Sequence, residues 1–129
     1  MNRDWSRGQL LAASSAYWRG CALQAGVRLG VFTALAEGQA SLEEIAARIE
    51  ADGRGTELLL NALAAMGLLV KEGRRYANTP AAQEFLSRAS DRYLGHIILH
   101  HHHILDGWAQ LDQAVRHGAP VRRRSYGEA

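Results

Sequence analysis

The chain has 129 residues, with 15 Lys+Arg, 13 Asp+Glu, 6 His and 1 Cys, and 47% of its residues are hydrophobic. This length accommodates one compact domain, and the apolar content excludes a disordered chain. Because Cys21 has no partner for an internal disulfide, a reducing, cytoplasmic location is expected. Without Arg122, Arg123 and Arg124 the formal charge of +2 would become −1, so general affinity for nucleic acid or an anionic membrane is not supported.

The first predicted element is a helix that extends to about residue 29. Between residues 9 and 27 its only charge is Arg19, but its other polar residues exclude a transmembrane span. Apolar residues recur at three- and four-residue steps, which is typical of a helix. They are Leu10, Leu11, Tyr17, Trp18, Cys21, Ala22, Ala25 and Leu29. A helix with so little polar surface either forms the centre of the core or is shared with another subunit.

Two shorter helices are predicted next. The first lies between a bend bracketed by Gly26 and Gly30 and a stop at Gly38. Its inward-facing residues are Val31, Phe32 and Leu35. The second begins where Ser41 and Glu44 supply the two halves of a capping box. Its buried face consists of Ile45, Ala46 and Ile49.

A third helix is predicted from Thr56 to Met66, followed by Gly67 as a left-handed cap. The period of the pattern then changes from about 3.6 to 2 residues, which predicts a β-hairpin with a positive φ at Gly73. The order helix, helix, hairpin is typical of a winged-helix-like arrangement. A short helix should follow, with Thr79 as its cap and Pro80 at its first position.

The last predicted element is a single helix from Asp91 to His117, about 40 Å long, that ends at residues 118–120. Its apolar seam consists of Leu94, Ile97, Ile98, His101, Ile104, Leu105, Trp108, Leu111 and Val115. Such a helix would protrude from a domain of this size. Both ends of the chain therefore offer apolar helices that an intertwined dimer would cover.

Five of the 6 histidines lie within residues 96–103. His96, His100 and His103 share a helical face and are weak candidates for zinc ligands. No carboxylate is placed as in a zinc-protease motif and Cys21 is remote, so no metal is predicted. His101 falls on the apolar seam, where it is either a core or interface histidine or a polar contact in a ligand cavity.

The sequence contains few side chains suited to sequence-specific DNA binding and no recognisable catalytic motif. The second helix of the winged-helix-like unit supplies only Arg54, Glu57 and Asn61 toward a major groove, and the basic hairpin residues are as readily explained as solvated surface. A DNA-binding regulator is kept as an alternative.

Phosphate-binding loops, nucleophile elbows and dinucleotide-binding fingerprints are missing from the sequence, so the chain is expected to contain no catalytic residue and no cofactor site.

Segments in a characteristic order resemble the N-terminal dimerisation domain of plant-type and bacterial natural-product O-methyltransferases. They are AGVRLGVF at 25–32, SLEEIA at 41–46, LLNALAAMGLL at 59–69, YANTP at 76–80, and residues 108–120. The resemblance implies a mainly α, winged-helix-like domain over 1–120 with a small β-hairpin and long terminal helices, in an intertwined homodimer. It also implies a linker over 121–129 toward an absent Rossmann-like domain that binds S-adenosylmethionine.

The resemblance further implies a fragment of such an enzyme that is not catalytic by itself but lines the pocket of a small aromatic acceptor. The implied pocket residues are Tyr17, Trp18, Ile98, Leu99, His100, His101 and Ile104. The expected dimer contacts are Leu10, Leu11, Tyr17, Trp18, Cys21, Leu94, Ile97, Trp108 and Leu111. Neither nucleic acid nor a membrane is expected as a partner. A stand-alone module that binds an aromatic ligand or a metal is a further alternative.

Overall fold

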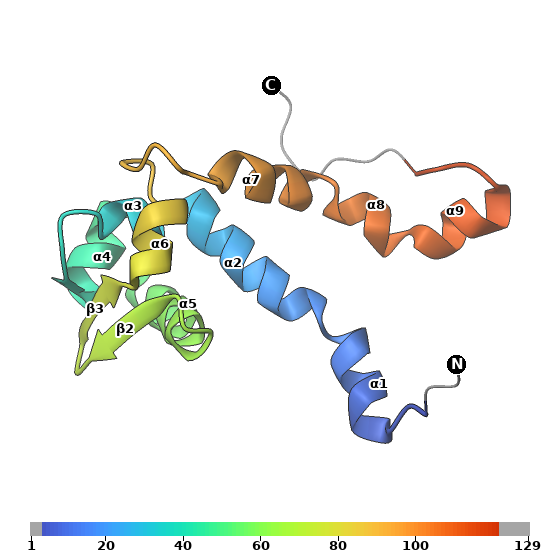
Figure 1. Ribbon diagram of the computed structural model, residues 1–129, viewed down its shortest axis with the longest axis horizontal. Coiled ribbons are helices and arrows are strands. Elements are labelled where there is room, and N and C mark those ends of the chain that lie inside the picture. The colour runs from blue at the N-terminus through green and yellow to red at the C-terminus, as the bar shows by residue number, and fades with distance from the viewer. Residues whose placement is uncertain (1–3, 122–129) are drawn as a thin grey trace.

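The computed structural model describes residues 4–121 and is mainly helical, with a small antiparallel sheet (Figure 1). Its helices are α1 (Arg7–Ser14), α2 (Tyr17–Leu29), α3 (Val31–Ala34), α4 (Leu42–Arg48), α5 (Gly53–Ala65), α6 (Pro80–Phe85), α7 (Gly95–His103), α8 (Leu105–Ala109) and α9 (Leu111–His117). Its strands are β1 (Ala40–Ser41), β2 (Leu69–Glu72) and β3 (Arg75–Asn78). None of the helices in this part of the chain has the length and apolarity needed to cross a membrane.

Figure 1 shows a body from which two helical arms extend. The body comprises α3 to α6 and the sheet, together with the parts of α2 and α7 that pack on them. The N-terminal arm is α1 with the first turns of α2, and the C-terminal arm is α8 with α9. The arms leave the body on the same side because α2 and α7 pack against each other at their base.

One hydrophobic core holds the body together. Its buried residues are Val27, Val31, Phe32, Leu35, Ala40, Leu42, Ile45, Leu60, Leu63, Leu69, Tyr76, Ala82 and Leu86. Tyr76 is the largest of these fully buried side chains, and its hydroxyl donates to Asn61 Oδ1 at 2.7 Å. The phenol therefore buries its ring without leaving its polar end unpaired.

The capping box at the start of α4 is confirmed. Glu44 N donates to Ser41 Oγ at 3.1 Å, and Ser41 N donates to Glu44 Oε1 at 3.2 Å. The Ser41 backbone bond lowers the pKa of the Glu44 carboxyl, with help from the Ser41 side chain and, at lesser strength, Arg48 and Arg75. The hydrogen bonds favour the charged carboxylate because it is the better acceptor.

The predicted hairpin is present, with Gly73 at a φ of 62°. The sequence pattern missed β1, which pairs with β3 at Ala40↔Tyr76 and Ser41↔Arg75 and gives the sheet its order β1-β3-β2. Helix α5 begins at Gly53 and not at Thr56, because Asp52 Oδ2 accepts from Gly55 N at 2.8 Å and caps the extra turn. Thr79 caps α6 with Pro80 at its first position, as predicted.

The prediction of one continuous N-terminal helix is wrong. The helix is interrupted at Ser15, where the backbone leaves helical geometry with φ −103° and ψ 8°. Ser15 Oγ donates to Leu11 O at 3.0 Å beside the backbone bond from Ser15 N, an arrangement that bends helices. The predicted bend occurs only at Gly30, whose φ of 79° ends α2. Gly26 instead lies inside α2, where an added Cβ would come within 3.0 Å of the Phe32 ring.

The prediction of one helix from Asp91 to His117 is also wrong. Residues 91–94 belong to the connection between α6 and α7, and Leu94 N donates to Phe85 O at 2.7 Å. Further on, the backbone leaves helical geometry at Ile104 and at Gln110, which separates α8 from its neighbours. Gly118 ends α9 with a φ of 69°, as predicted. Of the predicted linker at 121–129, all but Val121 lies outside the described residues.

Candidate functional site

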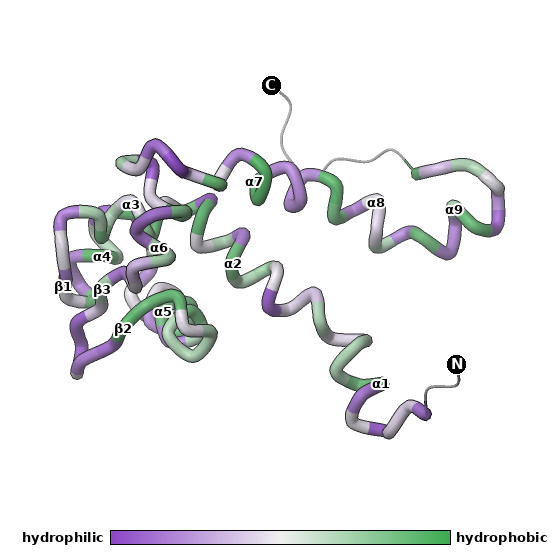
Figure 2. Tube along the Cα trace, viewed as in Figure 1, coloured by the Kyte–Doolittle hydropathy of each residue, from purple (hydrophilic) through white to green (hydrophobic). Residues whose placement is uncertain are grey.

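The arms carry a large exposed apolar surface. Helices α1, α8 and α9 contain no buried residue. Exposed large apolar side chains on or beside the arms are Trp5, Leu10, Leu11, Tyr17, Trp18, Trp108, Leu111 and Val115. Figure 2 shows hydrophobic stretches recurring along both arms. Scattered apolar residues are normal on a surface, but clustered large ones indicate an interaction site.

A groove lies between the two arms, and we refer to it as the arm groove. It is a cavity of about 420 Å³ lined by Tyr17, Cys21, Leu105, Asp106, Trp108 and Ala109. A smaller cavity of about 120 Å³ continues from it and shares Cys21 and Leu105. The additional lining residues of the smaller cavity are Gln24, Ala25, Arg28 and His102.

Gln24 gives the smaller cavity an unusual polar atom. Its Oε1 is buried and accepts no hydrogen bond within residues 4–121. A buried acceptor in that state costs about 1–3 kcal/mol, so a donor from outside the described chain would stabilise it.

Of the residues that line the two cavities, Cys21 and Tyr17 were named from the sequence, whereas Gln24, Arg28 and Asp106 were missed. Helical spacing from Cys21 could have found Gln24 and Arg28.

The predicted pocket residues do not converge within one chain. Tyr17 lines the arm groove, and Trp18 packs edge-on to it with ring centroids 6.2 Å apart. Ile98 and Leu99 are partly buried against the body core. The predicted residues that remain are two exposed histidines, His100 and His101, and the half-buried junction residue Ile104. The exposure of His101 excludes it from the core of this chain.

Of the residues predicted as dimer contacts, all but Cys21 belong to the exposed large apolar side chains. Leu94 and Ile97, which lie at the start of α7, are among them. Cys21 is half-buried in the arm groove.

The weak metal candidates also stay apart. Within residues 4–121 no group of three or more His, Cys, Asp or Glu side chains is arranged to hold a metal ion. His96 instead packs edge-on to Tyr93, with ring centroids 5.2 Å apart.

Most of the side chains considered for DNA reading are engaged within the body, although Arg54 is exposed. Asn61 accepts from the Tyr76 hydroxyl, and Arg74 pairs with Glu43 at 2.6 Å. Lys71 lies 5.7 Å from the centroid of the Tyr76 ring, and other hairpin contacts include a 3.8 Å pair between Arg75 and Glu44. The hairpin charge is therefore largely balanced by neighbouring carboxylates and offers little free positive potential.

The fold and the exposed arms define an interaction domain, and comparison with known proteins identifies its family. The sequence profile of the O-methyltransferase dimerisation domain matches residues 11–88. The chain therefore belongs to the O-methyltransferase dimerisation-domain family, as its sequence motifs indicated.

Individual relatives agree with this assignment. The chain is 39% identical over 113 residues to the N,N-dimethyltransferase OxyT of Streptomyces rimosus, covering 84% of this chain and 32% of OxyT. It is 35% identical over 106 residues to a 3-hydroxy-5-methyl-1-naphthoate 3-O-methyltransferase of Streptomyces sahachiroi, covering 81% and 31%. The solved structure of PigF with SAH superposes with a TM-score of 0.82 at 30% identity, covering 88% of this chain and 34% of PigF. The chain thus spans about a third of the length of the curated relatives it matches.

Proposed function

We propose that this chain forms a homodimer through its two arms, as part of a methyltransferase that acts on a small aromatic acceptor. The exposed apolar surface of α1, α8 and α9 carries this proposal. Isolated helices this short are marginal in water, so their stability must come from packing. A second copy that inserts an arm into the arm groove would bury both surfaces at once.

The cofactor of the assembled enzyme would be S-adenosylmethionine, since PigF was solved with SAH. The described residues do not fit this cofactor: they form only the small antiparallel sheet β1-β3-β2. A Rossmann-like site needs parallel strands with a glycine-rich turn leading into a helix. We expect calorimetry to show no tight binding of S-adenosylmethionine by these 129 residues. Tight binding would contradict the proposal.

Sedimentation equilibrium on the full chain tests the dimer. Trp108→Glu and Leu11→Glu remove apolar side chains that are 64% and 63% exposed on opposite arms. A large aromatic anchor at an interface contributes about 2 kcal/mol or more, so Trp108→Glu should raise the dissociation constant at least about thirtyfold. The control is Leu58→Glu, because Leu58 is 60% exposed but lies on α5 in the body.

The control variant should associate as the wild type does. A wild-type chain that stays monomeric at micromolar concentration would overturn the dimer, as would equal effects of Trp108→Glu and Leu58→Glu.

For the acceptor we propose that Tyr17, Trp18, Ile98, Leu99, His100, His101 and Ile104 contribute to the pocket wall of the assembled enzyme. Since they do not converge in one chain, a second copy would have to bring them together. A neutral aromatic probe, 1-naphthol, titrated into the dimer should shift the NMR signals of Tyr17 and Trp18. Shifts confined to the body would contradict this assignment.

A further inference from the structure

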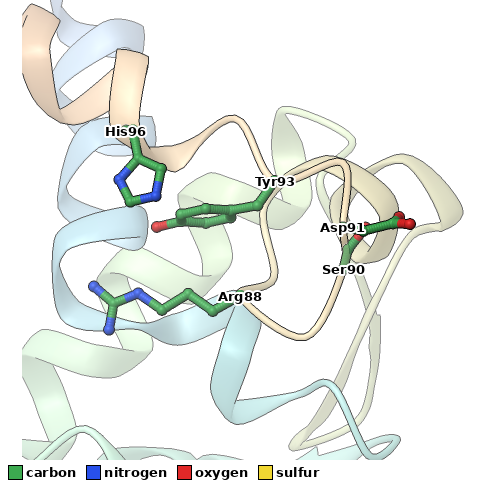
Figure 3. A pocket seen from close by; sticks show the side chains of 5 residues that line it. All are labelled: Arg88, Ser90, Asp91, Tyr93 and His96. Atoms are coloured by element: carbon green, nitrogen blue, oxygen red, sulfur yellow. The ribbon is translucent and has the colours of Figure 1, made fainter.

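A second cavity lies at the connection between α6 and α7 and shares no lining residue with the arm groove (Figure 3). Its volume is about 450 Å³, and its lining residues are Arg88, Ser90, Asp91, Tyr93 and His96. This volume lies within the range of small-molecule sites. No sequence motif pointed to it, and neither the dimer nor the cofactor proposal uses it.

Three hydrogen-bond donors face this cavity. Figure 3 shows the Arg88 guanidinium, the Tyr93 hydroxyl and the His96 ring gathered toward the same side, whereas the Asp91 carboxylate points away from them. Within residues 4–121 no ion pair or hydrogen bond engages the Arg88 guanidinium. The neighbouring Arg92 differs, because it pairs with Glu84 at 3.1 Å and lies 5.5 Å from the Phe85 ring centroid.

The body holds the backbone at Arg88 and the Tyr93 ring in place, while Arg88 and His96 are exposed residues. Arg88 N donates to Thr33 Oγ1 at 3.0 Å, which anchors the connection to α3. The Tyr93 ring lies directly over Gly95, where any Cβ would overlap it, and meets the His96 ring edge-on. Tyr93 is also partly buried against the core. A pre-organised donor such as the Tyr93 hydroxyl binds with a smaller entropy cost than a mobile one.

We propose that this cavity binds the carboxylate of a small aromatic molecule. Arg88 supplies a permanent positive charge and a planar fork that matches a carboxylate, and Tyr93 and His96 add an O–H and an N–H donor. A single permanent charge suits a monoanion better than a dianionic phosphate. The Tyr93 ring supplies an apolar wall beside these donors, which suits an aromatic ring on the ligand.

The test uses benzoate as the probe, titrated into the full chain and followed by NMR. Benzoate should saturate and shift the signals of Tyr93 and His96. Because a hydrogen bond to a charged group is worth about 1.5–3 kcal/mol, Arg88→Gln should weaken binding about tenfold or more. Tyr93→Phe, which keeps the ring, should weaken it a few-fold. The matched control Arg92→Gln should leave the affinity unchanged.

Neutral benzamide should not saturate the site, and acetate should bind more weakly than benzoate. Equal affinity of benzoate for the wild type and Arg88→Gln would overturn the site. Tighter binding of inorganic phosphate than of benzoate would overturn the assignment to a carboxylate, and equal binding of acetate would overturn the aromatic part. Because one chain forms the cavity, a failed dimer test leaves this result unaffected.

Discussion

The body and the arms both carry apolar residues but bury them very differently. In α5 of the body, Thr56, Leu60 and Leu63 are buried, whereas α1, α8 and α9 bury nothing. Both regions have well-formed caps, since Ser41 begins α4 and Ser6 begins α1 with the same reciprocal hydrogen bonds. Capping therefore sets where a helix begins, while burial decides whether it is stable within one chain.

Apolar residues therefore have two different roles in the body and in the arms. In the body, most apolar side chains pack against other elements of the same chain and are buried or half-buried. In the arms they face outward, and the arm groove offers a complementary surface. A chain that folds its body and leaves its arms uncovered is suited to association.

Hydrogen exchange should test the difference between the body and the arms most directly. Local opening free energies range from near zero in uncovered segments to the global value in core helices. In dilute solution, amides of α8 and α9 should exchange at least about a hundredfold faster than amides near Leu60 in α5. Raising the protein concentration should slow exchange in the arms alone. Arms as protected as α5 at the lowest concentration would contradict the division.

Leu63→Ala should have the largest effect on stability. Leu63 is 0% exposed in the core, and emptying such a site costs about 2–5 kcal/mol of unfolding free energy. Leu58→Ala on the outer face of the same helix should change it by less than about 0.5 kcal/mol. Urea unfolding measures both. Comparable losses would show that the exposed face of α5 is also covered.

Gly26→Ala should have a smaller effect, with the opposite sign from its control. An added Cβ would lie 3.0 Å from the Phe32 ring and 3.1 Å from Leu63 Cδ1. Overpacking costs about 1–3 kcal/mol, which exceeds the gain of about 1 kcal/mol for replacing a helical glycine. Gly20→Ala, with only the end of the Gln24 side chain 3.8 Å away, should be neutral or stabilising. Thermal unfolding of both variants tests this, and destabilisation by Gly20→Ala would show hidden crowding on the arm.

The two capping boxes offer the finest comparison. Ser41→Ala should lower the unfolding free energy by about 1 kcal/mol, whereas Ser6→Ala on the arm should leave the global transition unchanged. The pKa of Glu44 is lowered below its ordinary value of 4.5 by the Ser41 bonds. Ser41→Ala keeps the backbone N–H, which lowers this pKa most, and removes only the hydroxyl. The hydroxyl's share of the stabilisation is present above pH 4.5 and disappears as pH falls through the lowered pKa, so the effect of Ser41→Ala should shrink by that share in acid. An undiminished difference at pH 2 would contradict this linkage.

Local signals predicted much of the body. The Ser41 box, the Thr79 cap and the positive φ at Gly73 were each read from a few adjacent residues, because their hydrogen bonds close within three or four positions. Strand β1 was missed because it is two residues long and exists only through its pairing with β3. The Asp52 cap was missed because the polar stretch before Thr56 was interpreted as a break.

The candidate sites were harder to predict. The predicted apolar seams include Tyr17, Cys21, Leu105 and Trp108, which line the arm groove in the structure, but the expected pocket set is dispersed over the groove, the core edge and the surface. The cavity at Arg88, Tyr93 and His96 depends on a loop anchored to Thr33 of α3, and no pattern along the chain reveals that contact.

The sequence alone determined the family, the Ser41 and Thr79 caps and the apolar faces, since these depend on residue type and short-range spacing. Only the tertiary structure decided where the long helices break at Ser15, Ile104 and Gln110, which apolar faces stay uncovered, and which polar groups meet in a cavity. The physical reason is that periodicity shows that a face is apolar but not what it packs against. In this chain the body buries its apolar core within itself, whereas the arms leave their apolar faces exposed.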